Sequence, residues 1–162
     1  MDYLFSPWRY RYVSEARAGN ECVLCQKLAA RDDEANFILH RGRHNAVMLN
    51  LYPYTSGHMM ILPFAHVARL GDCDAAARAE MIEIAARGEQ ALEREYRPEG
   101  INLGMNLGAA AGAGIAGHLH LHLLPRWMAD ANFMTVVGET RVLPEALSDS
   151  YRRLRPYFLD GA

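Results

Sequence analysis

Cysteine is scarce in this sequence, and no apolar stretch is long enough to span a membrane. The 162 residues include three cysteines, an odd and small number that does not support a disulfide framework. No apolar run approaches the ~20 residues of a transmembrane helix. Residues 1–11 mix aromatic and charged side chains and lack the apolar core of a secretory signal. We therefore expect a reduced, cytoplasmic protein with no membrane partner.

An excess of charge of one sign is also lacking. The formal net charge is -2 with the seven histidines counted as neutral, and the isoelectric point is about 6.4. This balance argues against a nucleic-acid partner, but it leaves room for a small anion held in a local pocket. Hydrophobic residues make up 51% and charged residues 22%, which excludes a disordered chain. With no internal repeat and no long linker, residues 1–162 are expected to form one domain.

Residue patterns predict five short strands and two helices. A hairpin turn at 41–43 joins the first two strands. A long helix is capped by Asp72 or Asp74 and ends at Pro98, and Pro144 lies in the first turn of a terminal helix. The expected strands are 37–40, 45–51, 58–62, 101–106 and 118–124. The order predicts an α+β fold, with a mostly antiparallel five-stranded sheet, one long helix and one C-terminal helix.

Three of the seven histidines fall within five consecutive positions. His118, His120 and His122 alternate with leucines, so in a strand the imidazoles share one face while the leucines anchor the core. Three interpretations are open: a polar sheet face, a three-histidine zinc site, or a histidine nucleophile supported by its neighbours. Rings on one straight strand splay apart, which disfavours a single tetrahedral ion. A neutral imidazole, in contrast, can attack phosphorus or a carbonyl carbon.

A glycine-rich segment leads directly into the histidine strand. Its glycines allow the main chain to approach a ligand closely, and exposed backbone N–H groups in such turns bind anions. A flexible linker has the same composition, but the position immediately before three aligned histidines favours phosphate chemistry. The glycines are Gly104, Gly108, Gly112, Gly114 and Gly117.

Two of the cysteines form a CxxC pair. The spacing of Cys22 and Cys25 has three possible interpretations: a redox pair, a zinc site or a chance occurrence. A redox role calls for a thioredoxin-like βαβ unit, which the pattern lacks. A zinc site calls for two further ligands.

The histidine strand resembles the signature of the HIT (histidine triad) family, His-φ-His-φ-His-φ-φ with φ apolar, and 118–124 fills every position of it. The stretch 50–58 with 61–63 and His66 is similar to the family's earlier hairpin, and 102–117 to its phosphate-binding loop. A subgroup with bacterial diadenosine tetraphosphate phosphorylases is similar in further stretches. These are Trp8-Arg9, 125–127, 130–133 and 139–147.

The resemblance implies a two-step nucleotidyl transfer. His120 attacks the α-phosphorus of a nucleotide, and water or inorganic phosphate then removes the nucleotidyl group. His118 and His122 flank the phosphate, and His58 completes the cluster. Such an enzyme cleaves dinucleoside polyphosphates by phosphorolysis or hydrolysis. Two alternatives remain: a nucleotide-binding regulatory module with slow phosphoramidate or polyphosphate hydrolysis, and a zinc-dependent hydrolase with metal on the triad.

The resemblance also assigns nucleotide contacts. Asn50 matches a position that binds ribose hydroxyls, and Asn106 an amide near the scissile phosphate. Gly112, Gly114 and Ile115 fall in the phosphate-binding loop. Many relatives have Ser or Thr three residues before the first triad histidine, whereas this chain has Ile115, which offers only a backbone N–H.

A structural zinc is implied as well, because some relatives bind zinc at positions that match Cys22, Cys25, His66 and His118. No organic cofactor is implied. The family commonly forms twofold homodimers that join two sheets, and we expect the same here.

Overall fold

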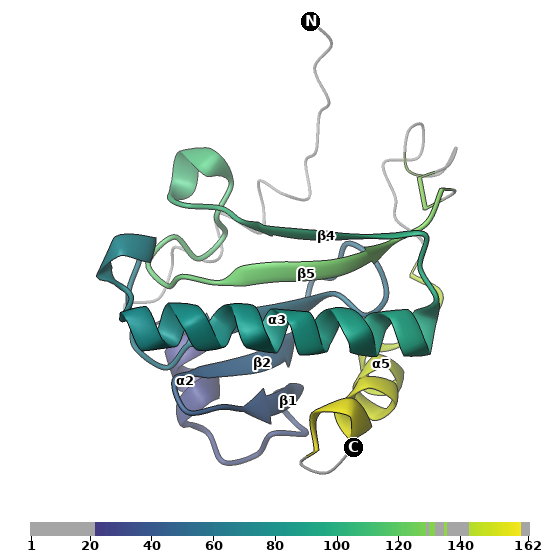
Figure 1. Cartoon of the computed structure of the whole chain (residues 1–162), viewed down its shortest axis with the longest axis horizontal. Helices are drawn as coiled ribbons and strands as arrows, with labels where there is room; N and C mark the ends of the chain where they lie inside the picture. Colours follow the sequence, from purple (N-terminus) through teal and green to yellow (C-terminus); the bar gives the residue numbers. More distant parts are fainter. Residues whose placement is uncertain (1–21, 129, 132–134, 136–142, 160–162) are drawn as a thin grey trace, which may run out of the picture.

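The computed structural model describes residues 22–128, 130, 131, 135 and 143–159 (Figure 1). Trp8, Arg9, Phe133 and residues 139–142, which contribute to the subgroup resemblance, lie outside the described residues. The helices are α2 (Val23–Ala29), α3 (Ala75–Tyr96) and α5 (Leu147–Leu154), with short 3-10 turns at Leu70–Asp72, Ala109–Ala111 and Arg155–Phe158. The strands are β1 (Ile38–Arg41), β2 (Asn45–Leu49), β3 (Met59–Pro63), β4 (Gly100–Met105) and β5 (Leu121–Arg126).

The five strands form one sheet in the order β1-β2-β3-β5-β4, with every neighbouring pair antiparallel. This confirms the expected α+β fold with a five-stranded antiparallel sheet. The last strand, however, begins at Leu121 rather than at 118. Ladder pairing with β3 starts at Leu121, opposite Ile61, whereas Leu119 donates its N–H to the carbonyl of Val67 at 2.6 Å. His118 and His120 therefore lie in the segment that leads into β5, and only His122 belongs to the strand.

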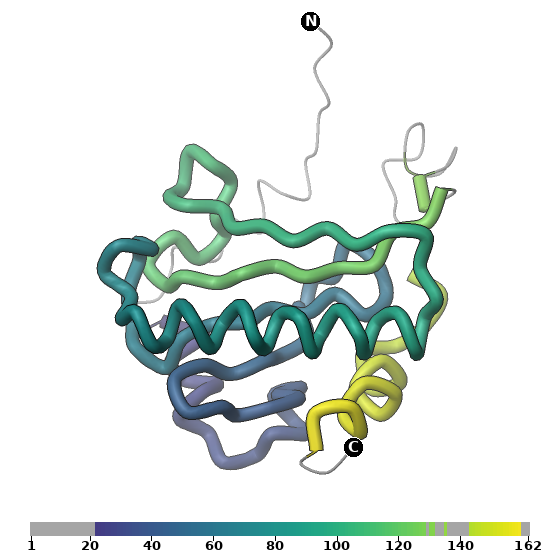
Figure 2. Tube along the Cα trace, viewed as in Figure 1, coloured from purple at the N-terminus to yellow at the C-terminus, as the bar shows by residue number. Residues whose placement is uncertain are grey.

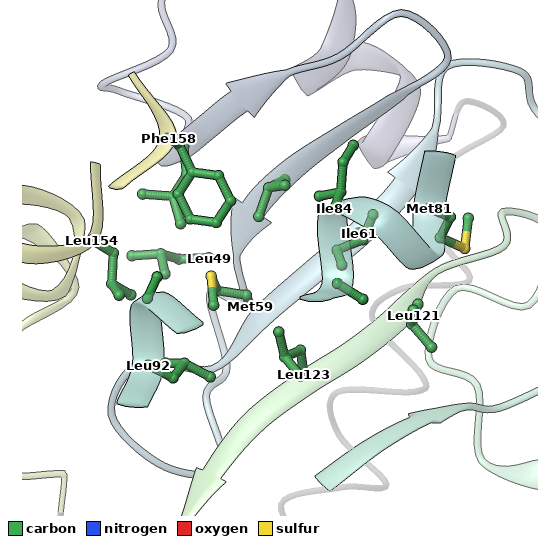
Figure 3. Packing of buried hydrophobic residues seen from close by; sticks show 14 of the residues in the cluster. Leu49, Met59, Ile61, Met81, Ile84, Leu92, Leu121, Leu123, Leu154 and Phe158 are labelled. Atoms are coloured by element: carbon green, nitrogen blue, oxygen red, sulfur yellow. The ribbon is translucent and has the colours of Figure 1, made fainter. Parts of the chain in front are cut away.

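The sheet is covered on both faces. Figure 1 shows α3 lying across one face, with α2 behind the opposite face. On β3, Met59 and Ile61 pack on the α3 side, while Met60 and Leu62 pack on the α2 side. Figure 3 shows the larger cluster, in which side chains from the sheet meet those of α3 and the C-terminal segment. Leu119, Leu121 and Leu123 all belong to this cluster, as the alternating pattern predicts.

The long helix begins and ends with specific backbone features. The side chain of Asp74 accepts a hydrogen bond from the N–H of Ala76 at 3.3 Å, which identifies Asp74 rather than Asp72 as the cap. Arg97 ends the helix in the left-handed conformation, with φ of 46°. Among the described residues, no helix has both the length and the apolar character needed to cross a membrane.

The C-terminal helix starts later than expected. α5 begins at Leu147, after Ala146, so Pro144 precedes it. The chain then continues as a 3-10 turn that buries Phe158. His40 is half-buried with its ring 6.0 Å from that of Phe158, and His44 is half-buried too.

Candidate active site

The structure brings His58 and His122 together across neighbouring strands. Met60 of β3 pairs with His122 of β5, which turns the His122 side chain away from α3 and towards the α2 side of the sheet. His58 lies immediately before β3, and its Nε2 is 3.0 Å from Nδ1 of His122. The two ring centroids are 5.1 Å apart. His58 is buried and His122 half-buried, so this contact is shielded from water on one side.

The neighbouring donors assign the protonation of both rings. The backbone N–H of Tyr54 donates to Nδ1 of His58 at 3.1 Å, so this nitrogen carries no hydrogen. A neutral His58 then carries its hydrogen on Nε2 and donates it to Nδ1 of His122. His122 in turn carries its hydrogen on Nε2 and can donate it to a group other than His58.

His120 has the opposite arrangement to His58. Its Nδ1 lies 2.7 Å from the carbonyl oxygen of His118 and must donate, because a carbonyl only accepts. The Nε2 of a neutral His120 therefore carries the lone pair. The ring lies 4.9 Å from that of His122, at an interplanar angle of 82°. A neutral His120 thus presents a lone-pair nitrogen, and its ring lies beside that of His122.

Burial lowers the pKa of two of the triad histidines, His122 and His118. Burial, together with the neighbouring His120, lowers the pKa of His122 to about 4. His122 is consequently neutral at pH 7, as the hydrogen-bonded chain from Tyr54 requires. Burial also lowers the pKa of His118, although its hydrogen bond to Pro63 acts in the opposite direction.

Both ring nitrogens of His118 are occupied away from His120. Nε2 donates to the carbonyl of Pro63 at 2.9 Å, so Nδ1 carries the lone pair. Nδ1 lies 3.5 Å from the sulfur of Cys22 and 3.4 Å from that of Cys25. The ring is 1% exposed. His118 therefore contributes its carbonyl to His120 and its ring to the cysteines.

A four-residue cluster surrounds that nitrogen. Cys25 Sγ is also 3.2 Å from Nδ1 of His66, and the four potential ligand atoms of Cys22, Cys25, His66 and His118 lie within 4.8 Å of one another. Two sulfurs and two imidazole nitrogens form a donor set that suits tetrahedral zinc. Gln26 and Ala29 join Cys22, Cys25 and His66 around a cavity of about 420 Å³. The residues therefore fit a metal ion.

The expected nucleotide contacts lie in two loops. Asn50 is 8% exposed; its Oδ1 accepts from the N–H of Tyr52 at 3.0 Å, and its Nδ2 is 3.4 Å from Nδ1 of His58. Asn106 directly follows β4, and Gly112 and Gly114 lie in the loop that leads to β5.

Ile115 has a clear packing role in this loop. Its half-buried side chain packs, as does Cys22, against the apolar cluster that includes Leu24, Met48 and Met60. An apolar residue at this position therefore anchors the loop on the α2 side of the sheet.

Tyr54 and Pro63 also position the histidines of the site, although the sequence patterns do not predict these roles. Tyr54 fixes the protonation of His58 through its N–H, and its ring lies 4.7 Å from that of His58 and 6.1 Å from that of His122. Pro63 supplies the carbonyl that orients His118. The only local sequence feature that points to Tyr54 is its position in an aromatic turn, four residues before His58. A backbone carbonyl leaves no sequence signal.

Comparison with known proteins agrees with this geometry. The family model described as the HIT domain matches residues 31–128. The chain belongs to the HIT family. This region contains all four histidines of the site and also His66, whereas Cys22 and Cys25 precede it.

Similar proteins include enzymes and a metal-bound structure. The chain is 35% identical to an AP-4-A phosphorylase of Mycobacterium tuberculosis over 93% of this chain and 81% of that protein. It is 28% identical to a bis(5'-nucleosyl)-tetraphosphatase [asymmetrical] of Schizosaccharomyces pombe over 57% of this chain and 50% of that protein. A Zn-bound histidine triad family protein from Mycobacterium smegmatis superimposes with a TM-score of 0.69 at 26% identity, covering 85% of this chain and 92% of that one. The chain is accordingly a HIT-family enzyme.

Proposed function

We propose that this HIT-family enzyme cleaves dinucleoside polyphosphates through a nucleotidyl-His120 intermediate, with inorganic phosphate as the preferred acceptor. The orientation of His120 is the observation that carries the proposal, because the His118 carbonyl binds Nδ1 and leaves the Nε2 lone pair available. Similarity to an AP-4-A phosphorylase over 93% of the chain favours phosphorolysis over hydrolysis.

The first step forms a bond between Nε2 of His120 and the α-phosphorus while the bond from phosphorus to the bridging oxygen breaks. The Nε2–H of His122 donates to an oxygen of the reacting phosphates, where negative charge increases. In the second step a phosphate oxygen attacks the same phosphorus and the N–P bond breaks. This step regenerates His120 and releases a nucleotide extended by one phosphate.

The surrounding loops supply the binding contacts in this proposal. Asn50 orients the ribose, and Asn106 contacts the scissile phosphate. Gly112, whose N–H donates to the carbonyl of Ala109 at 3.0 Å, shapes the loop. The backbone N–H groups of Gly114 and Ile115 bind the polyphosphate without needing a cationic surface patch.

The cysteine–histidine cluster has a structural role in this proposal. Cys22, Cys25, His66 and His118 hold zinc, which fastens the start of α2 to the segment before β5 and adds folding free energy. The reaction itself proceeds on His120 and its neighbours. No organic cofactor is required.

We also propose that residues 1–162 form one HIT domain and that two copies form a homodimer. β4 is an edge strand with Leu103 52% exposed, and such an edge can pair with a second sheet.

Product analysis with diadenosine tetraphosphate tests the function. ATP plus ADP should appear only when inorganic phosphate is present. Two ADP, or ATP plus AMP, without phosphate would identify a hydrolase instead. His120→Ala should abolish turnover while retaining AMP binding, and full activity in that variant would exclude the nucleophile.

The same assay separates the alternatives. Slow turnover at any phosphate concentration, together with tight nucleotide binding, would favour a regulatory module. Activity that is lost on chelation and restored by zinc, while the protein stays folded throughout, would favour metal on the triad.

A further inference from the structure

Tyr96, the last residue of α3, bridges two segments that are distant in sequence. A Cβ placed on Gly57 would lie only 2.9 Å from Cε2 of the Tyr96 ring, so ring and turn are in close contact. The Tyr96 hydroxyl donates to Glu145 in the C-terminal segment. Trp127 packs edge-on against the same ring, with centroids 6.4 Å apart.

The turn that Tyr96 contacts presents His58. Gly57 has φ of 76°, a conformation that favours glycine, and it directly precedes His58. Within this turn, Thr55 donates its hydroxyl to the carbonyl of Pro125 at 3.1 Å. Gly57 of the same turn contacts the Tyr96 ring. Movement of this ring would therefore reach the backbone of His58 and, through its hydrogen bond, His122.

The C-terminal segment holds the Tyr96 ring from outside. Ser150 of α5 donates to the same Glu145 oxygen at 2.6 Å, and Arg153 lies 3.6 Å from the other oxygen. The Arg153 guanidinium also sits over the Tyr96 ring, 5.8 Å from its centroid. Figure 2 shows the terminal helix beside the end of α3. These residues follow the 31–128 region that matches the HIT domain.

The Tyr96 hydroxyl is a permanent donor. Burial and the hydrogen bond to Glu145 raise its pKa far above the usual range of a phenol. The phenol is accordingly protonated at neutral pH and donates its hydrogen to Glu145.

We propose that Tyr96, held by Glu145 and α5, is a positioning residue for the His58–His122 pair. Thus α5, which lies outside the region that matches the HIT family, helps to hold His58 and His122 in position. The effect on turnover rests on the proposed function of this site, whereas the effect on the histidine rings does not.

Two variants disrupt the hydrogen bond between Tyr96 and Glu145, and two matched variants control for other effects. Tyr96→Phe deletes the donor and Glu145→Ala the acceptor, while Glu145→Gln keeps an acceptor oxygen. Tyr157→Phe deletes another hydroxyl of the C-terminal segment, which donates to Glu95 at 3.1 Å and is not among the groups nearest to Gly57. NMR of 15N-histidine-labelled protein reports the ring nitrogens of His58 and His122, and steady-state kinetics with diadenosine tetraphosphate report kcat and KM.

Tyr96→Phe and Glu145→Ala should shift the ring-nitrogen signals of His58 and His122 and speed solvent exchange of the His58 Nε2–H. Because small misplacements of catalytic groups slow chemistry, kcat should fall about tenfold while KM changes less than about twofold. Glu145→Gln should restore both readouts towards wild type, and Tyr157→Phe should leave them unchanged.

Unchanged ring signals and kcat in folded Tyr96→Phe would overturn the proposal, and so would equal changes in Tyr157→Phe. Should Glu145→Ala fail to fold, Tyr96→Phe decides alone. Absence of turnover in the wild type would instead reject the proposed function. The ring-nitrogen spectra would still show whether Tyr96 positions His58 and His122.

Discussion

At the scale of single residues, the four histidines of the site have four different partners at Nδ1, and only His120 carries its hydrogen on that nitrogen. His120 donates from Nδ1, His58 accepts at Nδ1, His122 accepts at Nδ1 from His58, and His118 presents Nδ1 to two sulfurs. Each state follows from the neighbouring backbone or side-chain group. The alternating sequence predicted that the residues act together, but it contained no information about which nitrogen of each ring carries the hydrogen.

The low pKa of His122 makes stability depend on pH. In the unfolded chain a histidine titrates near ~6.5, whereas folding lowers the pKa of His122 to about 4. Between these values only the unfolded state binds the proton. The contribution of His122 to the free energy of unfolding is therefore fully present above pH 6.5 and falls as the pH decreases from 6.5 to 4. One proton contributes at most about 1.4 kcal/mol per pH unit.

Urea unfolding between pH 4.5 and 7 measures this effect. His122→Asn should show a shallower loss of stability at acidic pH than the wild type. The variant retains some loss, because burial lowers the pKa of His118 as well. Parallel stability curves for the two proteins would contradict the assignment.

At the scale of secondary structure, the sequence predicted the strands to within a few residues, because alternation and turn residues are local signals. The residue patterns did not predict the short helix α2. A second error concerns β5, for which the histidine–leucine alternation continues through 118–120 although ladder pairing does not. Side-chain alternation requires only an extended backbone. Strand pairing also requires a neighbour, and Leu119 instead bonds to the loop residue Val67.

Glu80 of α3 illustrates how a helix fixes a hairpin. Its carboxylate accepts the backbone N–H groups of Arg43 at 2.6 Å and His44 at 2.8 Å, and the Asn45 amide at 2.7 Å. Burial alone would raise the pKa of Glu80, but these hydrogen bonds outweigh it and hold the pKa below its usual range.

Glu80→Ala should therefore destabilise the protein by about 1–3 kcal/mol, since three donors lose their acceptor. The exposed Glu83 on the same helix provides the matched control, and Glu83→Ala should change the free energy of unfolding by less than about 0.5 kcal/mol. Equal urea midpoints for the two variants would show that the hairpin does not depend on Glu80.

At the scale of the whole molecule, the cysteine–histidine cluster joins segments up to 96 residues apart. It links the start of α2, the segment after β3 and the lead-in to β5. Arg41 fastens the other end of α2 by donating to the carbonyls of Leu28 and Ala30 at 2.7 and 2.8 Å. The helix is thus held at both ends, with its apolar side chains against the sheet between them.

Metal analysis tests the proposed zinc. The purified protein should contain about one zinc per chain, and Cys22→Ala should lose most of it and unfold at a lower temperature. Cys73→Ala is the matched control, because Cys73 is buried before α3 outside the cluster and its loss should not alter the zinc content. Equal zinc content in Cys22→Ala and the wild type would exclude the site.

The residue types of this site and their local order follow directly from the sequence. The alternation of histidines and leucines, the glycine-rich loop, the turn before His58 and the CxxC pair are all local patterns, which periodicity and turn chemistry make readable. Only the packing of the chain sets which nitrogen of each histidine carries the hydrogen, that His118 faces the cysteines, and that α5 is linked to the turn before His58 through Glu145 and Tyr96. These properties arise from contacts between segments far apart in the chain, and such contacts exist only once the sheet and helices have packed.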